Sequence, residues 1–178
     1  MHQDVLSFWF TEISPAQQWK ADPAFDQLIK ARFAKLHASA VRVELSAWRV
    51  DAAGRLAEII VLDQFSRNLH RHSALAFAAD PMALALAQEA VAAKLDQTLS
   101  PAQRVFLYMP FMHSESPLIH EVAERLFREN GIQNNHDFEL KHKAIVDRFG
   151  RYPHRNAVLG RVSTPVELSF LEQPGSSF

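Results

Sequence analysis

The sequence contains no cysteine, only five glycines in 178 residues, and few runs of strand-forming β-branched residues. The absence of cysteine excludes disulfides, thiolate metal sites and a cysteine nucleophile, and it fits a reducing compartment such as the cytoplasm. No segment approaches the roughly 20 apolar residues of a membrane span. The short apolar stretch at the amino terminus follows Asp4 and no basic region, which argues against a signal peptide. We therefore expect a cytoplasmic protein with no membrane partner.

Several chemistries lack their sequence signatures. There is no glycine-rich phosphate loop and no GxGxxG, GxSxG or HExxH motif. His120 and Glu124 are four residues apart, which is a weak metal signal that more often marks a solvated helix face. The formal net charge of −1 gives no overall attraction to nucleic acid. We expect no cofactor, no metal and no nucleic-acid partner, and the sequence leaves the oligomeric state open.

What the sequence does contain is a helix-forming composition and repeated helix-start signals. Ala, Leu, Arg, Glu and Gln are plentiful. Asp, Ser or Thr precedes proline at several points, which is the pattern of a capping residue before proline at the first helical position. The patterns predict helices over 4–11, 22–37, 44–50, 56–71, 80–93, 100–112, 116–130, 134–149 and 164–171. Because the loops are short, we expect one all-α domain of antiparallel helix pairs over residues 1–178, with 172–178 as a flexible tail.

The helix predicted over 56–71 carries polar side chains within apolar surroundings. It is apolar on nearly every side, which is typical of a buried helix, yet it contains Asp63, Gln64, Arg67 and Asn68. Such groups are costly to bury unless they are paired. Asp63 and Arg67 are four residues apart, and so are Gln64 and Asn68. Either a polar site lies inside the protein, or an ion pair and an amide pair only fix the helix packing.

A second polar group ends the apolar helix predicted over 100–112. Pro110 would remove one helical hydrogen bond and kink the helix, and His113 and Glu115 follow it. These two side chains could serve as an acid–base pair or as metal ligands. Helix-terminal capping is the alternative, because residues two apart do not share a helix face.

A third polar group begins on the helix predicted over 134–149. His142 shares one helical face with Phe138, Ile145 and Phe149, so it is predicted to point inward. A lone inward histidine is usually a hydrogen-bonded core residue.

The arginine-rich stretch 148–156 follows that helix. Gly150 suits a helix end and Pro153 prevents continuation. The next short helix then begins with three polar residues, which are His154, Arg155 and Asn156. A helix start with an arginine beside it is a ready anion site. The alternative is a structural turn clamped onto acidic partners such as Asp63 or Glu115.

Six different motifs occur, one after another, along almost the whole chain. They are Val5–Phe10, Leu62–Asn68, Ala76–Pro81, Tyr108–Glu115, Arg148–Asn156, and Leu159–Arg161 with Ser163–Pro165. With these motifs the chain resembles the mainly bacterial domain-of-unknown-function family 924. The resemblance implies an all-α fold like the tetratricopeptide-repeat superhelix, although the repeat signature is missing, and it implies no activity. Pro117–His120 departs from the more acidic and amide-rich pattern usual in the family.

We expect the three polar groups to converge on one pocket. Its floor would be formed by Asp63, Arg67 and Asn68, with His113 and Glu115 from the proline-containing helix. Opposite them would lie His142, His154, Arg155 and Asn156. The first functional hypothesis is binding of a small anionic molecule or a peptide. The alternatives are a hydrolase-type enzyme with His–carboxylate acid–base chemistry, and a polar cluster that only fixes the fold.

Overall fold

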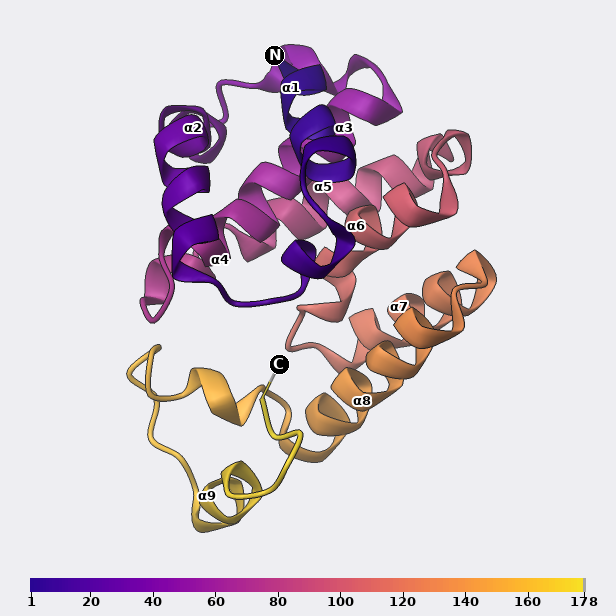
Figure 1. Ribbon diagram of the computed structural model, residues 1–178. Helices are drawn as coiled ribbons and strands as arrows, with labels where there is room; N and C mark the ends of the chain where they lie inside the picture. The colour runs from indigo at the N-terminus through magenta and orange to yellow at the C-terminus, as the bar shows by residue number, and fades with distance from the viewer. Residues whose placement is uncertain (178) are drawn as a thin grey trace.

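The computed structural model describes residues 1–177, which form helices joined by turns and contain no β-strand (Figure 1). The α-helices are α1 His2–Ser7, α2 Pro23–Val41, α3 Ala52–Ile60, α4 Ser66–Leu69, α5 Asp80–Ala92, α6 Pro101–Met112, α7 Pro117–Asn130, α8 Gln133–Phe149 and α9 Pro165–Leu171. The all-α prediction is confirmed. The more specific likeness to a tetratricopeptide superhelix remains a prediction.

Short irregular helical segments connect or extend these helices. Two are π-helical, η1 Phe8–Glu12 and η4 Val61–Phe65. The others are 3-10 turns, namely η2 Pro15–Gln18, η3 Ser46–Val50, η5 Ala74–Ala76, η6 Leu95–Thr98 and η7 Pro153–Arg155. Residues 172–177 form further turns, in which the Ser176 hydroxyl donates to the Leu171 carbonyl at 3.1 Å. The last residue of the predicted tail, 178, lies outside the described part.

Most of the predicted helix starts have the expected caps. The Asp22 carboxylate accepts from the backbone N–H groups of the first turn of α2, and capping boxes at Ser100 and Thr164 begin α6 and α9. Two candidates behave differently. Ser116 precedes α7 but makes no side-chain cap, and Asp80 is the first residue of α5 while its carboxylate bonds elsewhere.

The central helix is one continuous run through α3, η4 and α4, from Ala52 to Leu69. The sequence predicted a start at residue 56 after a separating Ala-Ala-Gly, but those residues form the first turn, capped by Asp51 at 2.7 Å from the Gly54 N–H. Gly54 lies directly on the preceding turn, because a Cβ there would be 1.9 Å from the Trp48 carbonyl oxygen. Only glycine fits this approach.

The π-helical turn η4 widens the middle of the central helix. A wider turn leaves carbonyl groups without their usual partners. The Ser66 hydroxyl donates to the Leu62 carbonyl at 2.5 Å, and Arg67 Nη1 donates to the Asp63 carbonyl at 2.8 Å. Side chains of the following turn therefore satisfy the backbone that η4 frees, and Asp63 lies inside the widened turn.

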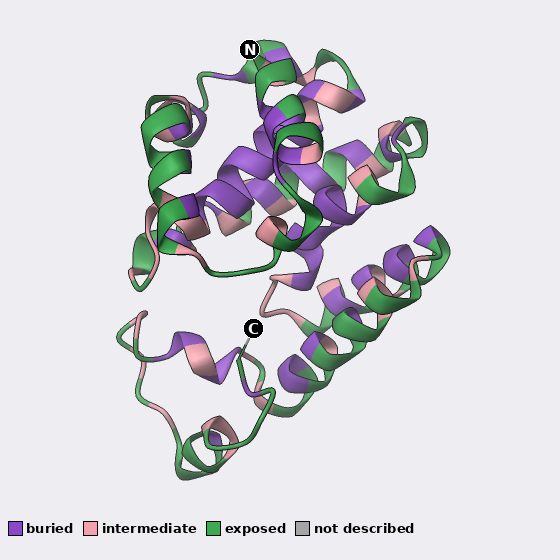
Figure 2. Cartoon of the chain, viewed as in Figure 1, coloured by how far each residue is buried: buried purple, intermediate pink, exposed green. Residues whose placement is uncertain are grey.

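The core surrounds this central helix. Helices α1, α5 and α6 pack against α3, and the buried residues concentrate where these helices meet (Figure 2). Among the largest buried side chains are Trp9, Phe65 and Phe111. A smaller apolar cluster of Ile145, Val146 and Tyr152 lies between α8 and the segment that follows it. Helices α7 and α8 lie side by side as an antiparallel pair (Figure 1).

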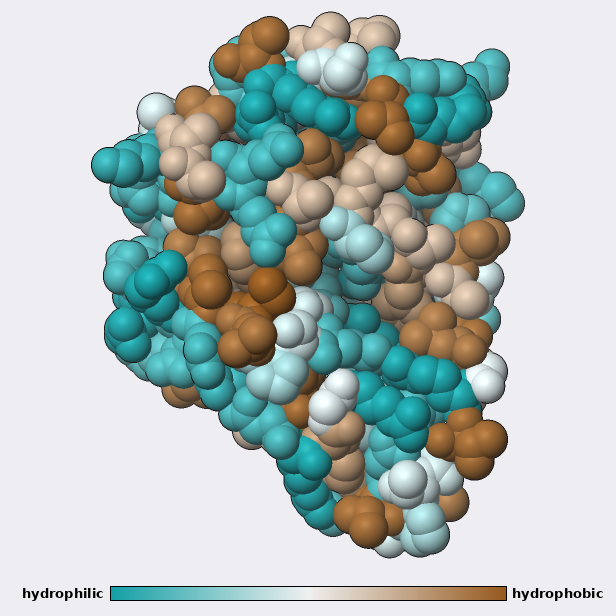
Figure 3. All heavy atoms as spheres, turned by 180° about the vertical axis from the view of Figure 1, so that it is seen from behind, coloured by the Kyte–Doolittle hydropathy of each residue, from teal (hydrophilic) through white to brown (hydrophobic). Residues whose placement is uncertain are grey.

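One helical stretch, Ala74–Ala92, is long and apolar enough to cross a membrane, which corrects the expectation that no segment approaches that length. One face of this stretch packs inward, since α5 packs on α3 and α6 and its Asp80 is paired with Arg67, and 33% of it is buried. On the face opposite that of Figure 1, hydrophobic residues occur in small groups between hydrophilic ones (Figure 3). The described chain shows no clear membrane-protein character.

Candidate functional site

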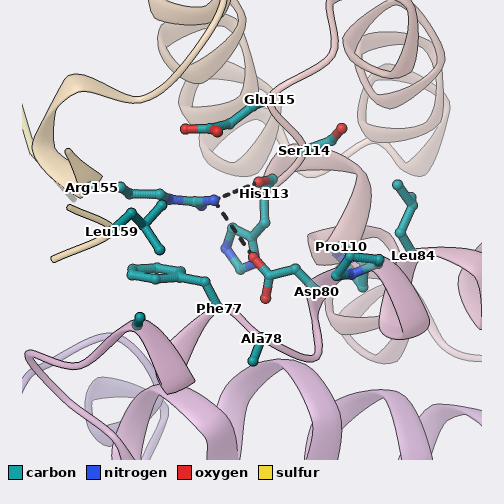
Figure 4. Close-up of a pocket in the computed structure, with 12 residues that line it drawn as sticks. Phe77, Ala78, Asp80, Leu84, Pro110, His113, Ser114, Glu115, Arg155 and Leu159 are labelled. Carbon is teal, nitrogen blue, oxygen red and sulfur yellow. Dashed lines mark hydrogen bonds and ion pairs between the residues drawn. The ribbon is translucent and has the colours of Figure 1, made fainter. Parts of the chain in front are cut away.

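A pocket of about 340 Å³ opens where three distant parts of the chain meet. They are the stretch from η5 into α5, the end of α6 with the turn after it, and the segment after α8 (Figure 4). The polar lining residues are Asp80, His113, Ser114, Glu115 and Arg155. The apolar ones are Ala74, Phe77, Ala78, Pro81, Leu84, Pro110 and Leu159. Pro110 lies in the last turn of α6, next to the residues that the sequence singled out.

Arg67 lies behind the pocket and is paired with two carboxylates. Its Nη1 is 3.1 Å from Asp63 Oδ1, and the guanidinium also binds Asp80 in a bidentate manner at 2.8 and 3.0 Å. The predicted pair of Asp63 and Arg67 is therefore present. Asp80 was missed as a site residue because the Asp-Pro dipeptide reads as a helix cap.

His113 and Asp63 form a buried dyad. Asp63 is 0% exposed, and its Oδ1 lies 2.7 Å from His113 Nδ1. Gln64 Nε2 donates to the other carboxylate oxygen at 2.6 Å. The predicted Gln64–Asn68 amide pair is wrong, because Gln64 bonds to Asp63.

The dyad has a defined protonation state. Burial raises the pKa of Asp63, but the Arg67 charge and the hydrogen bonds from His113 and Gln64 outweigh it and hold that pKa well below its usual range. Burial, with Arg67, lowers the pKa of His113 despite the nearby Asp63 carboxylate. We therefore assign an ionised Asp63 and a neutral His113 whose Nδ1–H donates to it. Nε2 then carries the lone pair of the imidazole.

Arg155 is the most deeply placed cation of the pocket lining. Its side chain is 9% exposed and is stacked between two rings, with Cζ 4.6 Å from the Phe77 centroid and 4.5 Å from the Tyr152 centroid. Its Nη1 donates to the His113 carbonyl at 3.1 Å and lies 3.6 Å from Asp80 Oδ2, while its buried Nε has no hydrogen-bond partner. Burial lowers the pKa of Arg155, yet guanidinium stays charged at neutral pH.

Glu115 forms the opposite wall from Asp80 (Figure 4). Its carboxylate binds Arg161 at 2.6 and 2.9 Å and also accepts the Tyr152 N–H at 2.7 Å. Burial opposes ionisation, but Arg161 and the Tyr152 N–H lower the pKa of Glu115 overall. The arginine that binds Glu115 is thus Arg161, which lies outside the stretch 148–156 and was not included in the site by the sequence hypothesis.

A buried hydrogen-bond network supports the turn that carries His113 and Glu115. His120 Nε2 donates to the Ser114 carbonyl at 2.9 Å, and His120 Nδ1 lies 2.7 Å from Glu139 Oε1. The Tyr152 hydroxyl donates to the Met112 carbonyl at 2.6 Å. The sequence placed His120 on a solvated face, which is wrong, because it is 0% exposed. Its partner Glu139 lies 19 residues away in sequence, and no local pattern relates the two.

The His120–Glu139 pair holds one proton between two buried groups. Since Nε2 must carry a hydrogen to donate to a carbonyl, a further proton is shared between Nδ1 and the carboxyl group. Both side chains are 0% exposed, and burial raises the pKa of Glu139. The neutral arrangement of a carboxylic acid donating to imidazole fits these surroundings.

Six predicted site residues do not line the pocket. Two of them, Asp63 and Arg67, bind the lining residues His113 and Asp80. The Asn68 amide bonds to Asp26 of α2 at 2.8 Å, and the Asn156 amide bonds to Ser163 at 3.0 Å. His142 and His154 lie behind the pocket wall, with their rings 5.7 and 5.5 Å from that of Tyr152.

The inward position of His142 is confirmed, because it is 7% exposed and its Nδ1 bonds to the Phe138 carbonyl at 2.8 Å. Phe138 itself is 41% exposed, so its predicted inward position is wrong. Burial lowers the pKa of His142 to about 3 and that of His154 to about 4, which keeps both rings neutral.

Within residues 1–177, no group of three or more His, Asp or Glu side chains is arranged to hold a metal ion. The chemical resources of the pocket are therefore the Arg155 guanidinium, the Asp63–His113 dyad and the hydroxyl of Ser114. Together they offer cationic hydrogen-bond donors and one neutral base.

Comparison with known proteins gives two matches. The family model for a bacterial protein of unknown function, DUF924, matches residues 5–175. The solved structure of the protein of unknown function ATU0120 from Agrobacterium tumefaciens is 38% identical and covers 96% of each chain, with a TM-score of 0.91. No curated protein matches the chain.

Proposed function

The chain belongs to the bacterial protein family of unknown function DUF924, and we propose that it binds a small anionic molecule in the pocket beside Arg155. The observation that carries this proposal is the incomplete pairing of Arg155 among well-paired neighbours. Its closest carboxylate contact is 3.6 Å long and involves one nitrogen. Guanidinium prefers bidentate partners, so Arg155 has donor capacity left for a ligand.

The acidic residues of the pocket do not form a binding site for a cationic ligand. Asp80 is held bidentately by Arg67, and Glu115 is held bidentately by Arg161. Their oxygens are engaged and their charges compensated, so a cationic ligand gains little from them. Arg155 extends between these two carboxylates and points toward His113 and Asp80 (Figure 4). An anion in the pocket would meet the donors that these two contacts leave unused.

The size and position of the pocket favour a small molecule over an extended peptide. A volume of about 340 Å³ lies at the lower end of the range for ligand pockets. A peptide could place only its terminal carboxylate there. We place this activity in the cytoplasm, because a chain without cysteine suits a reducing compartment.

Thermal unfolding with a panel of acetate, benzoate, succinate, phosphate and sulfate tests the proposal. At least one anion should raise Tm with increasing concentration, because a ligand that binds only the folded state stabilises it. Arg155→Gln should abolish the ligand-induced shift. Arg148→Gln removes the same charge outside the pocket, and this variant should retain the ligand-induced shift in Tm. Equal shifts in both variants, or no shift with any anion, would refute binding at Arg155.

A second candidate function is hydrolysis, which the geometry of Asp63 and His113 favours. A neutral imidazole fixed through Nδ1 by a buried carboxylate is the arrangement of a general base. His113 Nε2 would take a proton from water as the water oxygen bonds to the carbonyl carbon of an ester or amide. The imidazolium would then return that proton to the leaving group as its bond to carbon breaks.

Recovery of the bound ligand separates the two candidates. A ligand recovered unchanged supports binding alone. Recovery of the two cleavage products in equal amounts supports hydrolysis. For hydrolysis, His113→Gln should lower turnover by roughly 10²- to 10⁴-fold while the Arg155-dependent stabilisation persists. Unchanged turnover in that variant would exclude His113 as the base.

A further inference from the structure

The pocket is lined by both charged and apolar side chains. We propose that its ligand is a monocarboxylate with a hydrocarbon or aromatic body of about ten non-hydrogen atoms, seated with its carboxylate on Arg155 and its body on the apolar wall. This inference rests on the proposed function and narrows it to one class of ligand.

The charges around the pocket favour a monoanion. Six charged side chains surround it, and their formal charges cancel: Arg67, Arg155, Arg161, Asp63, Asp80 and Glu115. One added negative charge can be balanced by one proton on His113, which lies against Asp63 and lines the pocket. A dianion such as phosphate would leave a further uncompensated charge in a partly buried site, which is costly.

The arginine geometry favours a carboxylate among monoanions. The planar guanidinium presents donors in a fork that matches the two oxygens of a carboxylate. Stacking between Phe77 and Tyr152 fixes the plane of the Arg155 guanidinium. The Nη1 donor to the His113 carbonyl further restricts its rotation, and Nε is buried. The guanidinium is therefore oriented before a ligand arrives, with Nη2 as the donor that no hydrogen bond uses.

Apolar side chains at both ends of the pocket provide contact for the body of the ligand. Leu84, Pro110 and Leu159 line it together with Phe77 and small residues of η5 and α5. In Figure 4 these side chains surround the space that Arg155 faces, with Leu159 and Phe77 beside the guanidinium and Leu84 with Pro110 at the far end. A purely polar anion would leave this wall in contact with water, whereas a hydrocarbon body would bury it.

The volume limits the length of that body. A space of about 340 Å³ holds roughly ten water-sized groups. Octanoate and phenylacetate each have that number of non-hydrogen atoms, whereas a long-chain fatty acid would extend far outside. These two compounds are therefore suitable probes.

The test is isothermal titration of the wild-type protein with acetate, butyrate, hexanoate and octanoate, alongside 1-octanol, octylamine and inorganic phosphate. Each buried methylene should tighten Kd by roughly fourfold, so affinity should rise steeply along the carboxylate series. Octanol and octylamine should bind at least tenfold more weakly than octanoate. In Arg155→Gln octanoate should lose at least tenfold in affinity, whereas Arg148→Gln should match the wild type.

The outcomes distinguish this inference from the proposed function. If acetate or phosphate binds through Arg155 and chain length adds nothing, the amphiphilic ligand is refuted while anion binding stands. If octylamine or octanol binds as well as octanoate, or if Arg155→Gln binds octanoate like the wild type, both are refuted. The chain-length series uses the wild-type protein alone, so it decides the question even if Arg155→Gln is unstable.

Discussion

The carboxylate of Asp63 lies 2.7 Å from the His113 imidazole and 3.1 Å from the Arg67 guanidinium, and Asp63 itself is fully buried. One buried anion thus links the central helix to the end of α6 and supports the cation that holds Asp80. The same side chain matters for the fold and for the chemistry of the pocket.

Replacing Asp63 should destabilise the protein strongly. Asp63→Ala leaves Arg67 with one carboxylate fewer and His113 without its acceptor, and loss of one partner from a buried ion pair costs roughly 3–5 kcal/mol. Urea unfolding followed by circular dichroism measures the loss. Glu44→Ala, which removes an exposed ion pair with Arg42, should leave the midpoint nearly unchanged. Similar midpoints for the two variants would contradict the structural role of Asp63.

Anion binding should become tighter as the pH falls from about 7 to 5. Burial and Arg67 keep the pKa of His113 low in the free protein. A bound anion favours the protonated ring and raises that pKa, so binding takes up a proton and is favoured by acid. The other charged groups around His113 are Asp63, Arg67, Asp80 and Arg155.

Calorimetry in two buffers with different ionisation enthalpies measures the proton uptake. The observed binding enthalpy should differ between the buffers by the amount expected for up to one proton. His113→Gln should remove both the buffer difference and the pH dependence. A wild-type affinity that is constant from pH 7 to 5 would show that His113 does not compensate the ligand charge.

The folded state should lose stability as the pH falls from about 6.5 to 5. Burial lowers the pKa of His37 and His154 to about 4 and that of His142 to about 3. The unfolded chain binds these protons near pH 6.5, so stability is complete above that pH and declines below it, by up to about 1.4 kcal/mol per pH unit for each group. The pKa of His113 is also lowered. Glu139, whose pKa is raised, acts in the opposite direction but is one group against four. Urea midpoints that do not change between pH 7.5 and 5 would contradict this assignment.

The shared proton of His120 and Glu139 predicts different effects for two substitutions. In Glu139→Gln the amide N–H can replace the carboxylic acid proton as donor to His120 Nδ1, so we expect a loss within about 1 kcal/mol. Glu139→Leu leaves Nδ1 buried and unpaired and should cost roughly 1–3 kcal/mol. Denaturant unfolding compares the two variants. A larger loss for the glutamine variant would mean that the pair is ionised.

The first turn of α3 should not tolerate a larger residue at Gly54. A Cβ there would be 1.9 Å from the Trp48 carbonyl oxygen, so Gly54→Ala must displace backbone and should cost at least roughly 1–3 kcal/mol. Gly160 has a φ of +66° but no atom within 4 Å of an added Cβ. Gly160→Ala should therefore cost less, and the reverse order in thermal unfolding would contradict this packing.

The sequence predicted the helices and the inward polar residues from local patterns. The apolar residues on nearly every side of the helix that carries Asp63 and Arg67 indicated a buried pair. The helical period predicted an inward position for His142. Those inferences succeed because the period of a helix relates residues three and four apart. The family resemblance extended the fold prediction to the whole chain.

The missed contacts come from residues that local patterns cannot relate. Glu115 and Arg161 are 46 residues apart, and Arg67 and Asp80 belong to different helices. Asn68 was misplaced for another reason. The π-helical turn before it changes the angular positions of later residues, and Asn68 faces Asp26 on α2.

The widened turn η4 makes the winding of the central helix as important as its composition. If Val61–Phe65 wound as a regular α-helix with the same number of residues, everything after it would rotate by about 100°. Arg67 would then point away from Asp80, and the back wall of the pocket would lose its cation without any change of side-chain chemistry. Changes that remove the widened turn without shortening the helix are therefore expected to be as damaging as substitution of the charged residues themselves.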